Sequence, residues 1–148
     1  MDTTRMRTWA EIDLTALEHN YRTLRAMLPR ECRFLGLCKA NAYGHGAAVI
    51  GHTLERLGAD MLAVACVSEA EELRQSGVKL PILCLGETPE ELIPLLLELD
   101  VTQMVEDLET GRRLSAAAQR AGRTLRVHVK LDTGMSRLGF LWEAGREE

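Results

Sequence analysis

The sequence predicts an α/β fold built on a parallel sheet. Short apolar runs of strand length recur along the chain, and each is followed by a segment whose apolar residues have helical spacing. No linker rich in Pro, Gly or Ser interrupts this alternation, and 46% of the 148 residues are hydrophobic. One globular unit with its own buried core is therefore expected.

Five apolar runs form the predicted sheet. Helical segments separate them, so neighbouring strands are expected to run parallel through right-handed crossovers. The first run is compact and predicts a strand buried on both faces. A doubly wound sheet and a (β/α)8 barrel both fit this pattern, and in a barrel these would be about the first five strands. The predicted strands are residues 34–38, 61–67, 80–85, 101–105 and 125–131.

A short strand and a helix are predicted ahead of this sheet. Residues 8–14 alternate enough to form the strand, and Thr15 with Glu18 makes a capping box for the helix. The helix places its apolar residues at helical spacing and ends at Pro29. Its predicted core residues are Leu17, Tyr21, Leu24 and Leu28.

The helices between the strands have start and stop signals of their own. Ser68 with Glu71 predicts a capping box, and Pro89 takes the first position of a later helix that also contains Pro94. Asp107 begins the last of them. The first of these helices carries the apolar residues Ile50, Leu54 and Leu57, and the second ends at Gly77. The third has a core face of Leu92, Leu95, Leu96 and Leu99, and the last runs through Leu114 and Ala118 to its end at Gly122.

Charge and cysteine content exclude several classes of function. Eighteen basic residues face 22 acidic ones, mixed along the chain, so no nucleic-acid partner is expected. The four cysteines form no C-x-x-C pair and have no His at zinc-ligand spacing, so we expect reduced thiols and no metal site. No signal peptide or membrane span is evident, and a cytoplasmic location is the default expectation.

The segment from Lys39 to Gly46 holds the strongest chemical signal. Lys39 directly follows the first predicted strand, at the end where α/β barrels place catalytic groups, and a desolvated amine there can attack an aldehyde. Gly44 and Gly46 allow a tight turn, and Tyr43 offers a hydroxyl to an anion. From position alone, a lysine that only marks the end of a strand is the more common case.

A second polar cluster lies on and after the fifth predicted strand. Alternation puts His128, Lys130 and Asp132 on the face opposite Val127 and Val129. Polar groups in a buried strand need partners, so this face is expected to line a cleft or a network in which Lys130 and Asp132 satisfy each other. Both alternatives remain open from the residues alone.

Three strings of the sequence resemble the alanine racemase family. They are Lys39-Ala40-Asn41-Ala42-Tyr43-Gly44-His45-Gly46, the stretch from Val127 to Phe140 with its Met-x-Arg-Leu-Gly-Phe, and the opening Trp9-Ala10-Glu11-Ile12-Asp13-Leu14 with His19 and Asn20 after it. They follow one another in the family's order across residues 8–140. The resemblance implies a (β/α)8 barrel.

The resemblance also implies a cofactor and roles for four residues. It implies pyridoxal 5'-phosphate held by Lys39 as a Schiff base, with Tyr43 at the cofactor phosphate. Arg137 would lie beside the cofactor's phenolic oxygen and the substrate carboxylate. A guanidinium suits this role because it is permanently charged and can bind in a forked geometry. Lys130, carbamylated in many members, would brace Arg137.

The implied reaction is the interconversion of L- and D-alanine, a step that supplies bacterial peptidoglycan. Members of the family are homodimers and more than twice this length, so residues 1–148 are expected to be the N-terminal portion of the cofactor-binding barrel domain, without the C-terminal β domain. That domain carries the tyrosine base for the opposite face, so we expect the 148 residues alone to be inactive. A non-catalytic pyridoxal-phosphate protein, or a racemase for another amino acid such as serine, is the alternative.

Overall fold

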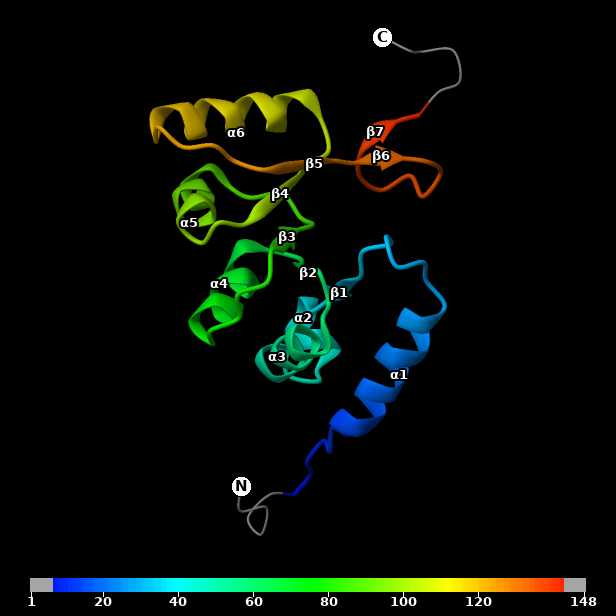
Figure 1. Cartoon of the computed structure of the whole chain (residues 1–148). Helices are drawn as coiled ribbons and strands as arrows, with labels where there is room; N and C mark the ends of the chain where they lie inside the picture. Colours follow the sequence, from blue (N-terminus) through cyan, green and yellow to red (C-terminus); the bar gives the residue numbers. More distant parts are fainter. Residues whose placement is uncertain (1–6, 143–148) are drawn as a thin grey trace.

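A computed structural model describes residues 7–142, and its centre is one parallel five-stranded sheet. Each strand lies beside the next one along the chain, in the order β1-β2-β3-β4-β5 (Figure 1). A doubly wound sheet reverses its strand order at a switch point, whereas a barrel does not. The predicted α/β fold is confirmed, in its barrel form. The strands are β1 (Leu35–Leu37), β2 (Met61–Val64), β3 (Ile82–Cys84), β4 (Thr102–Val105) and β5 (Val127–Val129).

The helices between these strands lie along one face of the sheet (Figure 1). Helices confined to one face belong to a barrel wall, since a doubly wound sheet carries helices on both faces. The described helices are α1 (Leu14–Ala26), the turn α2 (Lys39–Tyr43), α3 (Ala47–Leu57), α4 (Val67–Gln75), the 3-10 turn η1 (Glu90–Leu92), α5 (Ile93–Glu98) and α6 (Leu108–Arg120). None of those within residues 7–142 is both long and apolar enough to cross a membrane.

The core lies between the middle strands and these helices. Leu62 and Ile82 are paired across β2 and β3 and are fully buried, as are Leu73 of α4 and Leu96 of α5. A side chain at Gly36 would put its Cβ 2.5 Å from Leu54 Cδ1, so this glycine lets α3 lie close to β1. The centre of the sheet therefore carries most of the packing.

The edge strand β1 differs from its prediction. The side chains of Leu35 and Leu37 are 38% and 42% exposed, so this strand is buried on the helix-facing side alone. The opposite face would point into the interior of a barrel, where the later strands of a closed ring would cover it. The apolar run at residues 34–38 does form a strand, as predicted, but among the described residues none packs over its second face.

The predicted N-terminal strand is wrong. Residues 8–13 have no strand partner among the described residues, and a lone extended segment gains no ladder hydrogen bonds. The predicted capping box at Thr15 is also wrong, because α1 already begins at Leu14. Asp13 caps it instead, and its Oδ1 accepts from the backbone N–H groups of Thr15 at 2.8 Å and Ala16 at 3.1 Å.

Two other predicted helix starts are shifted. Cys66 rather than Ser68 is the N-cap of α4, without a capping box. Pro89 precedes the turn η1, and Pro94 occupies the first turn of α5, where a missing N–H costs little. The exposed Leu92 is consequently outside the core. In contrast, Asp107 caps α6 as predicted, by accepting from the Thr110 N–H at 2.7 Å.

The last predicted strand is divided in two. β5 ends at Val129, and β6 (Leu131–Asp132) pairs in parallel with β7 (Phe140–Leu141) outside the main sheet. The loop between β6 and β7 carries Arg137. Beside β5, an apolar groove of about 500 Å³ against α6 leaves Val127 and Val129 exposed. A barrel places a helix over this side of its strands.

Candidate active site

Lys39 lies where the sequence placed it, as the second residue after β1. Its side chain is half-buried, and its Nζ stands over the ring of Tyr43 at 5.9 Å from the centroid, a cation–π distance. Tyr43 is 58% exposed. No salt bridge to Lys39 occurs in the described part of the chain, so its amine is not bound to a carboxylate there.

The segment after Lys39 is a left-handed turn, which the sequence did not predict. Ala40, Asn41, Ala42 and Tyr43 all have φ between +51° and +56°, and none of them is glycine. A non-glycine residue in this region costs roughly 1–2 kcal/mol. Four in succession are a strained element, and strain of this kind gathers at functional sites.

Local hydrogen bonds hold this turn. The Ala42 N–H donates to the Cys38 carbonyl at 2.9 Å, and Asn41 Oδ1 accepts from the Ala47 N–H at 2.7 Å, which caps α3. His45 Nδ1 donates to the Ala42 carbonyl at 2.8 Å. The predicted turn glycines Gly44 and Gly46 follow, with φ of +86° and +94°.

The second polar cluster is arranged differently from the prediction. Asp132 is buried, and its Oδ1 accepts from the N–H groups of Gly134 at 2.9 Å and Ser136 at 3.0 Å rather than pairing with Lys130. These backbone bonds, with that of Ser136 the largest cause, lower the pKa of the Asp132 carboxyl. Asp132 therefore braces the loop that carries Arg137.

Lys130 and Arg137 belong to the same region. Lys130 is half-buried and directly follows β5, and its carbonyl accepts from the Phe140 N–H at 2.9 Å. Arg137 is exposed in the loop between β6 and β7. No hydrogen bond or ion pair joins their side chains in residues 7–142, so the predicted bracing of Arg137 by Lys130 stays a prediction.

The candidate residues share one end of the sheet but lie at its two edges. Lys39 follows β1 and Lys130 follows β5, and all five strands are parallel, so both are at the carboxyl ends. This is the end at which barrel enzymes bind substrate. The structure brings Lys39 and Tyr43 together, and it leaves Arg137 at the opposite edge.

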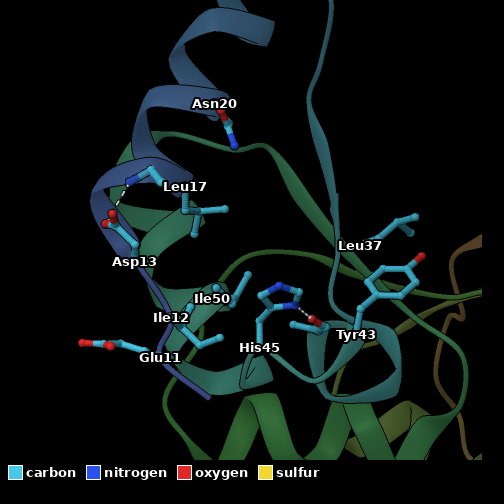
Figure 2. A pocket seen from close by; sticks show the side chains of 11 residues that line it. Glu11, Ile12, Asp13, Leu17, Asn20, Leu37, Tyr43, His45 and Ile50 are labelled. Carbon is cyan, nitrogen blue, oxygen red and sulfur yellow. Dashed lines mark hydrogen bonds between the residues drawn. The ribbon is translucent and has the colours of Figure 1, made fainter. Parts of the chain in front are cut away.

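A pocket of about 420 Å³ lies beside Tyr43, between α1 and α3 (Figure 2). Tyr43 and His45 line one side, and Leu17 with Asn20 of α1 line the other. Lys39 is not among its lining residues. The ends of the strands, rather than this pocket, therefore define the candidate site.

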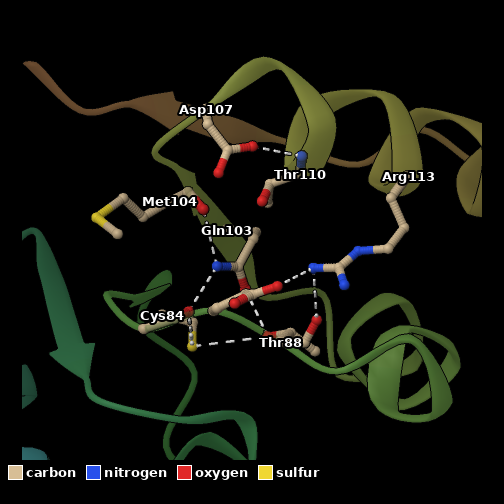
Figure 3. A network of polar contacts seen from close by, with 9 residues as sticks. Cys84, Thr88, Gln103, Met104, Asp107, Thr110 and Arg113 are labelled. Atoms are coloured by element: carbon tan, nitrogen blue, oxygen red, sulfur yellow. Dashed lines mark hydrogen bonds and ion pairs between the residues drawn. The ribbon is translucent and has the colours of Figure 1, made fainter. Parts of the chain in front are cut away.

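A buried polar network supports the same end of the sheet (Figure 3). The fully buried Gln103 of β4 accepts from Thr88 Oγ1 at 2.7 Å and donates to the carbonyls of Gly86 at 2.7 Å and Met104 at 2.8 Å. Arg113 of α6 adds a contact to the Thr88 carbonyl at 3.5 Å. The network ties the loop after β3 to β4 and satisfies the buried amide.

Sequence reasoning missed two acidic residues near these strand ends, Glu69 and Glu106. Asp132 was singled out, but its predicted surroundings were a cleft or a network with Lys130 rather than the backbone N–H groups of its own loop. Burial beside Glu87 raises the pKa of Glu106, which directly follows β4. An acidic residue in the first turn of a helix or directly after a strand was the signal available, but it is common on ordinary surfaces.

The fold and these residues define a barrel-type α/β protein with a lysine at the carboxyl end of its first strand. Comparison with known proteins identifies the family. The family model for the N-terminal domain of alanine racemase matches residues 12–147. The chain therefore belongs to the alanine racemase family.

Individual relatives agree with this assignment. The alanine racemase of Desulfovibrio desulfuricans is 44% identical over 131 residues, which are 88% of this chain and 35% of that protein. That of Methanococcus maripaludis is 42% identical over 140 residues, 95% of this chain and 38% of that protein. The solved alanine racemase of Clostridium difficile 630 superposes with a TM-score of 0.88 at 42% identity, covering 90% of this chain and 35% of that one. The chain thus spans about a third of the length of these relatives.

Proposed function

We propose that this chain provides the cofactor lysine of a pyridoxal-phosphate-dependent racemase that interconverts L- and D-alanine. The observation that carries the proposal is Lys39, half-buried at the carboxyl end of β1 and followed by a strained turn that fixes its surroundings. The family membership supports it, and the names of the relatives, which are alanine racemases, indicate the substrate.

The groups at these strand ends suit pyridoxal 5'-phosphate. The Lys39 amine can condense with an aldehyde, and the Tyr43 hydroxyl makes no hydrogen bond within residues 7–142, so it can donate to a phosphate oxygen. Arg137 is exposed and permanently charged, so it can bind a carboxylate in a forked geometry. An aldehyde, a phosphate and a substrate carboxylate are the groups that such donors recognise.

Each residue then has a role in the reaction. When bound, the cofactor supplies an electron sink for the negative charge that develops at the substrate α-carbon. Lys39 Nζ would hold the cofactor and would take or return a proton on one face of that carbon. Arg137 orients the substrate carboxylate. A carbamate on Lys130 would turn a repulsion between two cations into an attraction, and would brace Arg137.

The opposite face of the α-carbon needs a second base. The chain has two tyrosines: Tyr21 is buried against Phe34, with ring centroids 4.8 Å apart, and Tyr43 lies beside Lys39. Neither is placed across from Lys39. We propose that this base comes from residues outside the 148, in a homodimer as in the family, and that the 148 residues alone form the first five strands of the barrel domain and do not racemise alanine.

Borohydride trapping tests the role of Lys39. The chain contains only three lysines, Lys39, Lys79 and Lys130, so the labelled peptide identifies the residue without ambiguity. Incubation with pyridoxal phosphate and reduction should label Lys39, and Lys39→Ala should lose the label while Lys79→Ala, an exposed control, keeps it. Labelling at Lys79 or Lys130 in the unsubstituted chain would reject the assignment.

A chimera tests the activity and the substrate. Residues 1–148 would replace the matching third of the Clostridium difficile racemase, and turnover of alanine and of serine would be measured. Racemisation of alanine that is lost in Lys39→Ala supports the proposal. Faster turnover of serine than of alanine would indicate that serine is the substrate. Trapping at Lys39 without any turnover would favour a non-catalytic cofactor-binding protein.

A further inference from the structure

Glu69, in the first turn of α4, binds the ends of two strands at once. Its Oε1 accepts from the Ala40 N–H and its Oε2 from the Ala65 N–H, both at 2.7 Å. Ala40 follows Lys39, and Ala65 follows β2. Hydrogen bonds from backbone N–H groups to a carboxylate are charge-assisted, and they are shorter and stronger than neutral ones.

This carboxylate fixes the peptide group next to the Lys39 Cα. The Ala40 N–H belongs to the planar peptide unit that begins with the Lys39 carbonyl, so holding it restricts rotation on that side of Lys39. On the other side, the Cys38 N–H donates to the Ala63 carbonyl at 2.8 Å. Lys39 is therefore anchored on both sides of its Cα, by β2 before it and by Glu69 of α4 after it.

The strained turn gives this anchor its importance. Most hydrogen bonds of the turn come from residues 38–47 themselves. Among the described residues, Glu69 is the one side chain from another element that hydrogen-bonds it. Without that tie, Ala40 could relax out of its left-handed conformation at φ +51°, and the direction of the Lys39 side chain would change with it.

We propose that Glu69 is a positioning residue that holds the Lys39 backbone in the orientation needed for Lys39 to bind the cofactor. This inference rests on the proposed function, which gives Lys39 that task. A displacement of about 1 Å at a reacting group can lower a rate by about a hundredfold, so an anchor this close to Lys39 has a measurable effect on its chemistry.

Hydrogen exchange tests the anchoring without any cofactor. In Glu69→Gln the side chain keeps one accepting oxygen and turns an NH2 group toward the other amide, so at least one of the Ala40 and Ala65 N–H groups should exchange about tenfold faster. The matched control is Glu72→Gln, an exposed glutamate on the same helix, which should leave both rates unchanged. Unchanged exchange in Glu69→Gln would overturn the anchoring.

Cofactor trapping tests the consequence for Lys39. Below the unfolding temperature of each variant, Glu69→Gln should form the borohydride-trappable bond several-fold more slowly and give a weaker circular dichroism signal in the cofactor absorption band. Glu72→Gln should match the unsubstituted chain. Equal rates and equal band signals in all three proteins would overturn the proposal, because a purely structural glutamate would change stability alone.

Two further outcomes keep the inferences distinguishable. If the unsubstituted chain is not trapped at Lys39, the proposed function fails and the role of Glu69 in cofactor binding fails with it, while the exchange rates still decide the backbone anchoring. If Glu69→Gln does not fold, Glu69→Asp replaces it. That variant keeps the charge but is one methylene shorter, so it should show intermediate exchange and trapping rates, and unchanged rates would again overturn the proposal.

Discussion

Replacing Gln103 should reveal how much of the stability comes from the polar network behind the strand ends. Gln103 is fully buried in β4, and its side-chain amide makes three hydrogen bonds. Gln103→Ala removes all three. It leaves the hydroxyl of the buried Thr88 without its acceptor, and it leaves the Gly86 carbonyl with the weak Cys84 thiol as its remaining donor.

The expected cost is about 3–7 kcal/mol. Each buried group left unsatisfied costs about 1–3 kcal/mol, and two such groups account for most of the loss. The lost methylene adds about 0.8 kcal/mol of apolar burial. Since whole domains are stable by about 5–15 kcal/mol, the variant should lose much of its unfolding free energy. Urea unfolding followed by circular dichroism measures the difference, and Gln75→Ala on the exposed end of α4 should change it by less than about 0.5 kcal/mol.

Gln103→Glu has nearly the same shape and separates hydrogen bonding from packing. Its second oxygen would face the carbonyls of Gly86 and Met104, so the folded protein favours the protonated acid and the pKa of the new carboxyl should lie above its unfolded value. A raised folded pKa means that the deficit against the unsubstituted chain is smallest below about pH 4 and grows as the pH rises toward 7. A loss below 1 kcal/mol for Gln103→Ala, or a deficit of Gln103→Glu independent of pH, would refute this account of the network.

Two further predictions concern single side chains. Asp132→Ala should loosen the loop that carries Arg137 and make the Gly134 and Ser136 amides exchange faster, whereas Asp132→Asn keeps the accepting oxygen and should change their exchange little. Because the folded pKa of Asp132 is lowered, the stability that this carboxylate contributes is present above the unfolded pKa and should be lost as the pH falls through the folded pKa. Burial raises the pKa of the Cys38 thiol to about 11, so roughly one thiol in a thousand is ionised at pH 8 and iodoacetamide should label the exposed Cys66 first; equal labelling of both in the folded chain would contradict this.

The order of strands and helices could be predicted because it depends on local apolar spacing. Each of the five strands appears within its predicted run, and the helix from Asp107 to the turn at Gly122 has its predicted cap and end. Burial was less predictable. The run at residues 34–38 is apolar on both faces, but whether a face is covered depends on strands and helices elsewhere, so the exposure of Leu35 and Leu37 could not be read from the run itself.

The details of the candidate site depend on contacts between distant residues. Lys39 and Tyr43 were predicted, yet the left-handed turn that joins them contains no glycine among residues 40–43 to announce it. Its tie to Glu69 spans 29 positions of the sequence. The cap of α1 was predicted wrongly for a local reason, because Asp13 and Thr15 are both good caps and stand two residues apart.

The two loops that carry the candidate residues are held by the same device. Glu69 accepts from two backbone N–H groups at the end of β1 and β2, and Asp132 accepts from two in the loop after β6. Both loops lie at edges of the sheet, whereas the packed core and the Gln103 network lie at its centre. The carboxylates therefore contribute to placement as well as to stability. Substitutions at the centre should lower the unfolding free energy, and substitutions of the two carboxylates should in addition change the position of Lys39 or Arg137.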